Sequence, residues 1–218
     1  MKRIMNMAAL LLLITAASCK KSYIRGNGDT IIESRVVGGF TSVKTNGDIR
    51  LFVSYGTTQK VEVKGYANLV DITETRVENN KLVVKYKDEY YNVRNSNVEV
   101  YMTIPVLTGA ETNGSGNIEI GGFLNGTGIG LFTNGSGNVY VSNSRYDNTY
   151  LDVNGSGDIK APGLLAKNTE AVIHGSGDIE ISCTQNLKAR LYGSGDVRYW
   201  GNPLLDVATS GSGKVKKQ

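Results

Sequence analysis

Few of the side chains from which catalytic and metal sites are usually built occur in this chain. Its 218 residues include two cysteines, three prolines and one histidine, His174. The sequence around His174 offers no metal-ligand cluster and no Ser-His-Asp or Cys-His arrangement. The scarcity of proline, beside 27 glycines and 12 tyrosines, favours strands joined by tight turns over a disordered chain.

Neither sign of charge is in large excess. The formal net charge is +4, and it falls to +2 (22 basic minus 20 acidic residues) if Lys2 and Arg3 are removed with an export signal. So small an excess gives no support to nucleic-acid binding. Beyond residue 19 the sequence has no apolar run long enough to cross a bilayer as a helix.

Residues 1–18 are predicted to be a lipoprotein signal peptide. A basic start precedes an apolar stretch and the small residues Ala16-Ala17-Ser18. The sequence Ala-Ala-Ser-Cys resembles a bacterial lipobox, in which Cys19 would be acylated; cleavage as an ordinary secreted protein is the alternative. With Cys19 acylated, Cys183 has no disulfide partner, and its place in an alternating apolar segment predicts a buried side chain.

The strongest pattern is the tripeptide Gly-Ser-Gly, which occurs six times. Its copies begin at Gly114, Gly135, Gly155, Gly175, Gly193 and Gly211. Successive copies are 21, 20, 20, 18 and 18 residues apart. A period of this length is typical of a solenoid, in which each unit becomes stable by stacking on its neighbours.

Apolar residues alternate on both sides of each copy. Ile118 and Ile120 follow the first one, and Leu131 and Thr133 precede the second. This period of two predicts one strand entering and one strand leaving every Gly-Ser-Gly corner, with these side chains inward. Two or three short strands in each coil of about 20 residues predict an all-β fold, a right-handed parallel β-helix with Gly-Ser-Gly corners.

The pattern also predicts the domain organisation. Residues 19–30 are polar and aperiodic, and we expect a tether to the membrane. Residues 31–218 are expected to form a single β-helix domain, with regular repeats over 111–218 and irregular, longer strands over 31–110. The segment Asn46-Gly47-Asp48-Ile49 resembles a worn copy of the repeat, so the irregular half is predicted to form the first coils.

The corner residues have a mechanical explanation. Glycine adopts positive φ without steric penalty and lets adjacent coils approach, while the serines would form a column of hydroxyl groups. The next position suits an Asx turn. Asp158, Asp178 and Asp196 would stack there as a column of carboxylates, and Ca²⁺ is the ligand that such a column could hold. Because Asn117 and Asn138 occupy the same position, turn residues are favoured, and neither a metal nor a cofactor is expected.

Aromatic residues supply the other candidates. Tyr90 and Tyr91 interrupt the alternating pattern, and Trp200 lies near the end of the last repeats. Exposed aromatic rings can stack on sugars or on partner surfaces, so these three residues are candidate contacts for a glycan or other ligand. A loop with partly buried tyrosines is the alternative. His174 takes a position that other copies fill with Asn, which indicates a turn residue.

Several segments together resemble one bacterial family. They are the lipobox-like sequence, Gly39 to Lys44, Val100 to Pro105 and the repeated GSGN or GSGD. In these segments the chain resembles the putative auto-transporter adhesin head domain family, also called the GIN domain, which is common in lipoproteins of Bacteroidota. The resemblance covers roughly residue 36 to the C-terminus. It implies a right-handed parallel β-helix for which adhesion has been proposed from shape, and it carries over no functional residues.

These observations predict a non-enzymatic, lipid-anchored protein of the cell envelope. Its stacked sheets would present an adhesin-like or scaffolding surface to a glycan or to another envelope protein. The alternative is a polysaccharide-active enzyme, or a glycan-binding accessory protein, on a β-helix like that of the pectate lyases. Surface lipoproteins of the group that the resemblance indicates usually carry acidic residues after the acylated cysteine, whereas this chain has Lys20-Lys21-Ser22. The periplasmic face of the outer membrane is therefore favoured over the cell surface.

Overall fold

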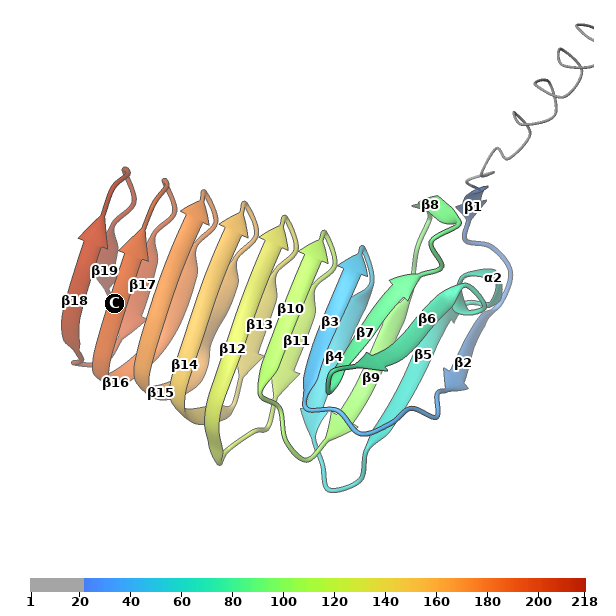
Figure 1. The fold of residues 1–218 in the computed structure, drawn as a ribbon, viewed down its shortest axis with the longest axis horizontal. Coiled ribbons are helices and arrows are strands. Elements are labelled where there is room, and N and C mark those ends of the chain that lie inside the picture. The colour runs from blue at the N-terminus through green and yellow to red at the C-terminus, as the bar shows by residue number, and fades with distance from the viewer. Residues whose placement is uncertain (1–21) are drawn as a thin grey trace, which may run out of the picture.

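The protein is built from coils that stack into a parallel β-helix (Figure 1). The computed structural model describes residues 22–218. Each coil has one strand that leads into a corner and one that leads out of it, and the two kinds of strand face each other across the core. In Figure 1 the first kind rises on the near side and the second descends on the far side as the chain advances from right to left, so the winding is right-handed.

The two sets of strands follow one another along the solenoid. Strands leading into a corner are, in spatial order, β7 (Lys81–Tyr86), β3 (Ser42–Gly47), β10 (Gly109–Gly114), β12 (Gly126–Gly135), β14 (Ser144–Gly155), the second parts of β15 (Ile159–Gly175) and β16 (Ile179–Leu191), and β18 (Leu204–Thr209). Strands leading out are β9 (Glu99–Ile104), β4 (Arg50–Tyr55), β11 (Ile118–Gly121), β13 (Val139–Ser142), the first parts of β15 and β16, β17 (Val197–Trp200) and β19 (Val215–Lys217). The predicted right-handed parallel β-helix is confirmed.

Neighbouring coils pair in parallel, with matching repeat positions side by side. Leu131 of β12 lies between Ala110 of β10 and Leu151 of β14, and Val139 of β13 pairs with Ile118 of β11. The period of two in a strand then turns the same set of side chains inward in every coil. A slip of one residue would expose that apolar set to water, which is why the register is constant.

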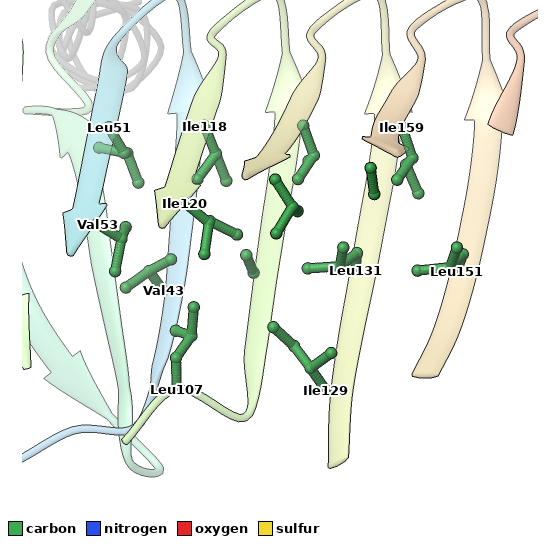
Figure 2. Close-up of a cluster of buried hydrophobic side chains, with 14 of the residues drawn as sticks. Val43, Leu51, Val53, Leu107, Ile118, Ile120, Ile129, Leu131, Leu151 and Ile159 are labelled. Carbon is green, nitrogen blue, oxygen red and sulfur yellow. The ribbon is translucent and has the colours of Figure 1, made fainter. Parts of the chain in front are cut away.

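The inward-facing side chains form one core along the stack. Figure 2 shows how side chains from both sheets, such as Ile118 and Leu131, meet between them. The buried apolar residues run from Phe40 to Tyr199, and Cys183 is among them with no exposed surface, as predicted. Within residues 22–218 these buried side chains pack against one another as a single cluster.

The N-terminal half departs from a simple succession of coils. The coil of β3 and β4 lies between two others, because β3 pairs with β7 and β10 while β4 pairs with β9 and β11. The chain makes this coil first and then runs through β5 (Lys60–Tyr66), α2 (Ala67–Val70) and β6 (Thr73–Glu78). It then forms the coil of β7 and β9 on the side of β3 and β4 that faces away from the repeats. The segment from Ile104 to Gly109 brings the chain back to β10 on the other side of that coil.

Antiparallel strands end the stack on this side. β5 pairs antiparallel with β2 (Thr30–Ser34) and with β9, and β6 pairs antiparallel with β7. Leu69 and Val70 of α2 are fully buried beside them. The strands of the N-terminal half therefore include a reversal of direction and a coil out of chain order, which the periodicity did not predict. Within residues 22–218 no helix is long and apolar enough to cross a membrane.

The tether expected for residues 19–30 differs from the structure, which has strand β1 (Ser22–Arg25) paired in parallel with β8 (Tyr90–Arg94). The amide groups of Asn68 and Asn95 donate hydrogen bonds to the carbonyl oxygens of Arg25 and Gly26. The prediction failed because polar composition does not reveal an edge strand elsewhere in the chain that can pair with such a segment. Residues 1–21, which include the predicted signal peptide and Cys19, lie outside the described residues.

Candidate functional site

The Asn and Asp residues after Gly-Ser-Gly form a ladder of hydrogen bonds between coils. Oδ1 of each side chain accepts the backbone N–H of the same position on the next coil, over 2.7 to 2.9 Å. The acceptors are Asn117, Asn138, Asp158, Asp178 and Asp196, and the last donor is Lys214. Each side chain thus caps the neighbouring coil, whereas an Asx turn within its own corner was predicted. Asn and Asp interchange because both supply this oxygen.

The second oxygens of the three aspartates pair with basic side chains. Oδ2 of Asp158 lies 3.1 Å from Nζ of Lys160, and Oδ2 of Asp178 lies 2.9 Å from the Arg198 guanidinium. Oδ2 of Asp196 lies 2.5 Å from Nζ of Lys216, and this hydrogen bond lowers the pKa of Asp196 below its usual value. Both oxygens of every carboxylate in the column are therefore engaged within the protein.

The geometry around this column is that of a structural element. Among residues 22–218, no group of three or more His, Cys, Asp or Glu side chains is arranged to hold a metal ion. The single histidine, His174, is exposed and stacks on Tyr192 of the next coil, with ring centroids 4.7 Å apart.

The two glycines of each corner have different roles. The first adopts positive φ in several coils, as at Gly114 with φ of +117°. The second has no room for a side chain, since a Cβ at Gly177 would lie 1.9 Å from the carbonyl oxygen of Gly157. The serine between them is exposed, and its backbone N–H donates to the preceding coil, as from Ser136 to Gly114. The corners are therefore built for stacking.

The three aromatic candidates lie at opposite ends of the solenoid. Tyr90 and Tyr91 belong to β8 at one end, whereas Trp200 ends β17 near the other (Figure 1). Trp200 is half-buried beside Ser182 on the outer face of its sheet. Tyr90 packs against the core, and Tyr91 is 64% exposed. The structure therefore brings two of the three candidate residues together and leaves Trp200 apart.

Tyr90 and Tyr91 line a hollow between β8 and the first corner, which we call the tyrosine hollow. Its volume is about 600 Å³. The other residues around it are Asn46, Gly47, Asp48, Lys85, Tyr86, Asp88, Val93, Gly114 and Ser115. The hollow therefore combines exposed aromatic surface with carboxylate, ammonium, amide and hydroxyl groups.

Two titratable groups in the tyrosine hollow are perturbed by their surroundings. Desolvation raises the pKa of Asp48 above its usual value, although a hydrogen bond from Tyr86 acts in the opposite direction. Desolvation also raises the pKa of Tyr86, whose hydroxyl lies 2.6 Å from Oγ of Ser96. The carboxyl group of Asp48 and the hydroxyl group of Tyr86 both line the hollow and offer hydrogen-bonding atoms to a ligand.

Sequence reasoning missed Asp48 and Tyr86. A signal for Asp48 was present in the worn copy of the repeat, because pairing of β3 with β10 aligns Gly47 with Gly114. Asp48 then takes the place of the corner serine, and Arg50 takes the place of the Asn or Asp residue. Aligning that segment on its glycine would have identified the one corner with a carboxylate at the serine position.

Comparisons with known proteins agree with this fold. The model of the family described as "Putative auto-transporter adhesin, head GIN domain" matches residues 39–203. A solved structure of a putative adhesin from Bacteroides fragilis is 22% identical, with a TM-score of 0.74 over 89% of this chain and 100% of that one. A putative lipid binding protein from Parabacteroides distasonis is also 22% identical, with a TM-score of 0.63 over 90% of this chain and 100% of that one.

A third solved structure, a putative adhesin from Parabacteroides merdae, is 19% identical with a TM-score of 0.51, covering 90% of this chain and 99% of that one. At these identities the similarity establishes the fold. A comparison with curated proteins found no significant match.

Proposed function

Since the chain belongs to the family of putative auto-transporter adhesin head GIN domains, we propose that it is a non-enzymatic, lipid-anchored protein of the cell envelope that binds a ligand in its tyrosine hollow. One observation carries this proposal. The repeated polar side chains of the corners are engaged in holding coils together, whereas Tyr91 is 64% exposed and lines the same hollow as Asp48.

The ligand that suits this hollow is a glycan of the envelope. Aromatic rings provide apolar faces on which sugar rings stack, and Asp48 and Ser115 can exchange hydrogen bonds with sugar hydroxyl groups. Such a site recognises a sugar without any reaction, in keeping with an adhesin-like function. An envelope protein that presents polar and aromatic side chains is the other partner considered.

Lipid anchoring is the second part of the proposal. Its support is the lipobox-like sequence before Cys19 and the start of β1 at Ser22, three residues later. Three residues span at most about 10 Å, so an acyl group on Cys19 would hold β1 and β8 close to the bilayer. The tyrosine hollow would then face ligands near the membrane, and Lys20 and Lys21 favour the periplasmic side of the outer membrane.

Binding can be tested with a chain of residues 22–218 and an array of envelope oligosaccharides, followed by calorimetry with any glycan that binds. Replacing Tyr91 by Ala is expected to weaken binding about fivefold or more, since stacking of a planar ligand such as a nucleobase on one aromatic side chain contributes about 1–3 kcal/mol. Tyr192→Ala is the matched control, because Tyr192 is also half exposed but lies on a distant corner. Equal losses for both variants would contradict a site at Tyr91.

The same chain of residues 22–218 tests the enzymatic alternative. Incubation with acidic polysaccharides, with and without Ca²⁺, is expected to release no products. Turnover that Asp178→Asn abolishes would overturn the non-enzymatic proposal.

Anchoring is tested by labelling cells with a radioactive fatty acid, which should mark the wild type but not Cys19→Ala. Protease treatment of intact cells should leave the domain intact if it lies on the periplasmic face.

A further inference from the structure

A second hollow lies on the opposite edge of the solenoid, away from the Gly-Ser-Gly corners. Its volume is about 490 Å³. It is bordered by the segment 105–108, which connects β9 to β10, and by residues 122–128, which lead from β11 into β12. We call it the apolar hollow.

The apolar hollow combines a buried floor with an exposed rim. Phe123, Leu107 and Tyr146 are almost fully buried. By contrast Tyr55, Val106 and Leu124 are each slightly more than half exposed although they are large and apolar. Exposed apolar side chains gathered around a hollow, rather than scattered singly, are typical of a binding site.

Among residues 22–218, those that line this hollow include no charged side chain. The remaining lining residues are Pro105, Thr108, Gly122, Asn125, Gly126, Thr127 and Gly128. Charged residues make up 20% of the whole chain, so a lining of 13 residues without any is a distinct environment. An ionic group would lose its hydration there without gaining a partner, and the site therefore suits an uncharged apolar ligand.

The unusual path of the chain explains why the hollow exists. Tyr55 ends β4, where the chain leaves the stack, and residues 105–108 bring it back past the middle coil. The hydroxyl of Tyr146 donates to the carbonyl oxygen of Leu107 over 2.9 Å and fixes the returning segment. Gly126 passes directly over the Tyr146 ring, since a Cβ there would lie 2.1 Å from it. The walls are therefore held in place without a ligand.

The hydrogen bonding of the walls argues against a peptide as the occupant. β10 is paired on both edges, with β3 and β12, and β4 is paired on both edges, with β9 and β11. The returning segment is also bonded, since Thr108 N–H donates to Thr41 and its carbonyl accepts from Gly130. A peptide could not add as a strand, whereas an aliphatic chain needs only apolar contacts.

From this geometry we propose that the apolar hollow binds the acyl chain of a lipid. The contact surface would be the rings of Tyr55 and Phe123, which meet edge to face with centroids 6.0 Å apart, and the side chains of Val106 and Leu124. The hydroxyl groups of Thr108 and Thr127 and the amide of Asn125 at the rim suit the polar end of such a lipid. This site is separate from the tyrosine hollow and does not depend on it.

The test uses a chain of residues 22–218 and the fluorescent fatty acid 11-(dansylamino)undecanoic acid. We expect saturable binding with a blue-shifted emission, displaced by unlabelled laurate. Leu124→Asp should weaken binding at least tenfold, because it places a charge in a site without counter-charges. Leu204→Asp is the matched control, since Leu204 is more exposed still but lies at the far end of the solenoid, and it should bind as the wild type does.

Two further measurements separate the sources of the acyl chain and the rival occupants. Flotation of the wild type, but not of Leu124→Asp, with phosphatidylethanolamine vesicles would identify a membrane lipid as the source, and binding of the free acid alone would identify a single-chain lipid. Absence of saturable binding, or equal binding by Leu124→Asp, would overturn the proposal. A dimer in solution that Leu124→Asp dissociates would also overturn it, because the hollow would then be an interface between copies. Tyr91→Ala should leave probe binding unchanged, so failure of glycan binding and failure of acyl binding remain distinguishable.

Discussion

The backbone N–H of Asp178 donates a hydrogen bond of 2.9 Å to Oδ1 of Asp158 on the preceding coil. The corners lie outside the regular strand pairing, so their backbone groups need partners of another kind. The ladder of Asn and Asp side chains provides one such partner for each coil. It continues the alignment of the strands through the corner and thereby couples each coil to the next.

Two variants at position 178 distinguish the contribution of the hydrogen bond to the next coil from that of the negative charge. Asp178→Asn keeps the ladder oxygen and loses only the ion pair with Arg198, which is partly exposed. We expect a loss of at most about 1 kcal/mol in the free energy of unfolding. Asp178→Leu also leaves the N–H of Asp196 without its acceptor and should cost about 1–3 kcal/mol more. Urea unfolding at neutral pH measures both, and equal losses would contradict a structural role for the oxygen.

Two buried threonines should respond in opposite ways to replacement by valine. Oγ1 of Thr133 is buried and has no hydrogen-bond partner within the described residues, and the next coil has Val153 at the paired position. Thr133→Val is therefore expected to stabilise the protein by about 1 kcal/mol. Thr112, whose Oγ1 donates to the carbonyl oxygen of Gly116, is the control, and Thr112→Val should destabilise by about the same amount. Thermal unfolding compares the two; a shift of the same sign for both would show that the hydroxyl bond is irrelevant.

The second glycine of a corner should not tolerate even one methyl group. A Cβ at Gly177 would lie 1.9 Å from the carbonyl oxygen of Gly157, so Gly177→Ala must push two coils apart. We expect a loss of more than about 4 kcal/mol, or failure to fold. Gly128→Ala is the matched control, because a Cβ there meets only ordinary contacts at 3.9 Å. Soluble yield and circular dichroism of the two variants give the answer, and a folded, stable Gly177→Ala would contradict the close approach.

Glu111 should make stability depend on pH in the acid range. Desolvation would raise the pKa of Glu111, but hydrogen bonds from Lys44 and Lys81 outweigh it and the pKa is lowered. A lowered pKa in the folded state means that the stabilisation is fully present above the unfolded value, about 4.5, and is lost as the pH falls through the folded value. Glu111→Gln should cost about 1–2 kcal/mol at pH 7.

The pH profile provides the check on this carboxylate. Below pH 4.5 the stability of the wild type should fall more steeply than that of Glu111→Gln, and the two curves should converge at lower pH. Glu119→Gln is the control, since Glu119 occupies an exposed position on β11, and its profile should follow the wild type. Parallel curves for the wild type and Glu111→Gln would show that Glu111 does not cause the loss of stability at acid pH.

The repeat itself made much of the fold predictable. The spacing of the glycines and the alternation around Ile118 and Leu131 predicted two strands in each coil and their inward faces, and the structure confirms both. These features depend on residues within about ten positions of one another. Local periodicity is sufficient for them because each coil repeats the same burial pattern.

Features that depend on distant residues were not predictable in this way. The pairing of β1 with β8 joins Arg25 to Arg94, and no pattern in either segment specifies the other. The placement of the first coil between two later ones has the same origin. The tyrosine hollow was half predicted, since Tyr90 and Tyr91 interrupt the alternation, but the approach of Asp48 and Tyr86 follows from that long-range topology.

The antiparallel strands β2, β5 and β6 close one end of the molecule, whereas regular coils occupy the rest of it. A coil can therefore be inserted among the regular repeats without altering either hollow, because both lie near the closed end. Each insertion of about 20 residues would lengthen the protein by about 4.8 Å, the spacing between paired strands. The repeat number thus acts as a molecular ruler, which sets how far the last coil lies from the two proposed binding sites.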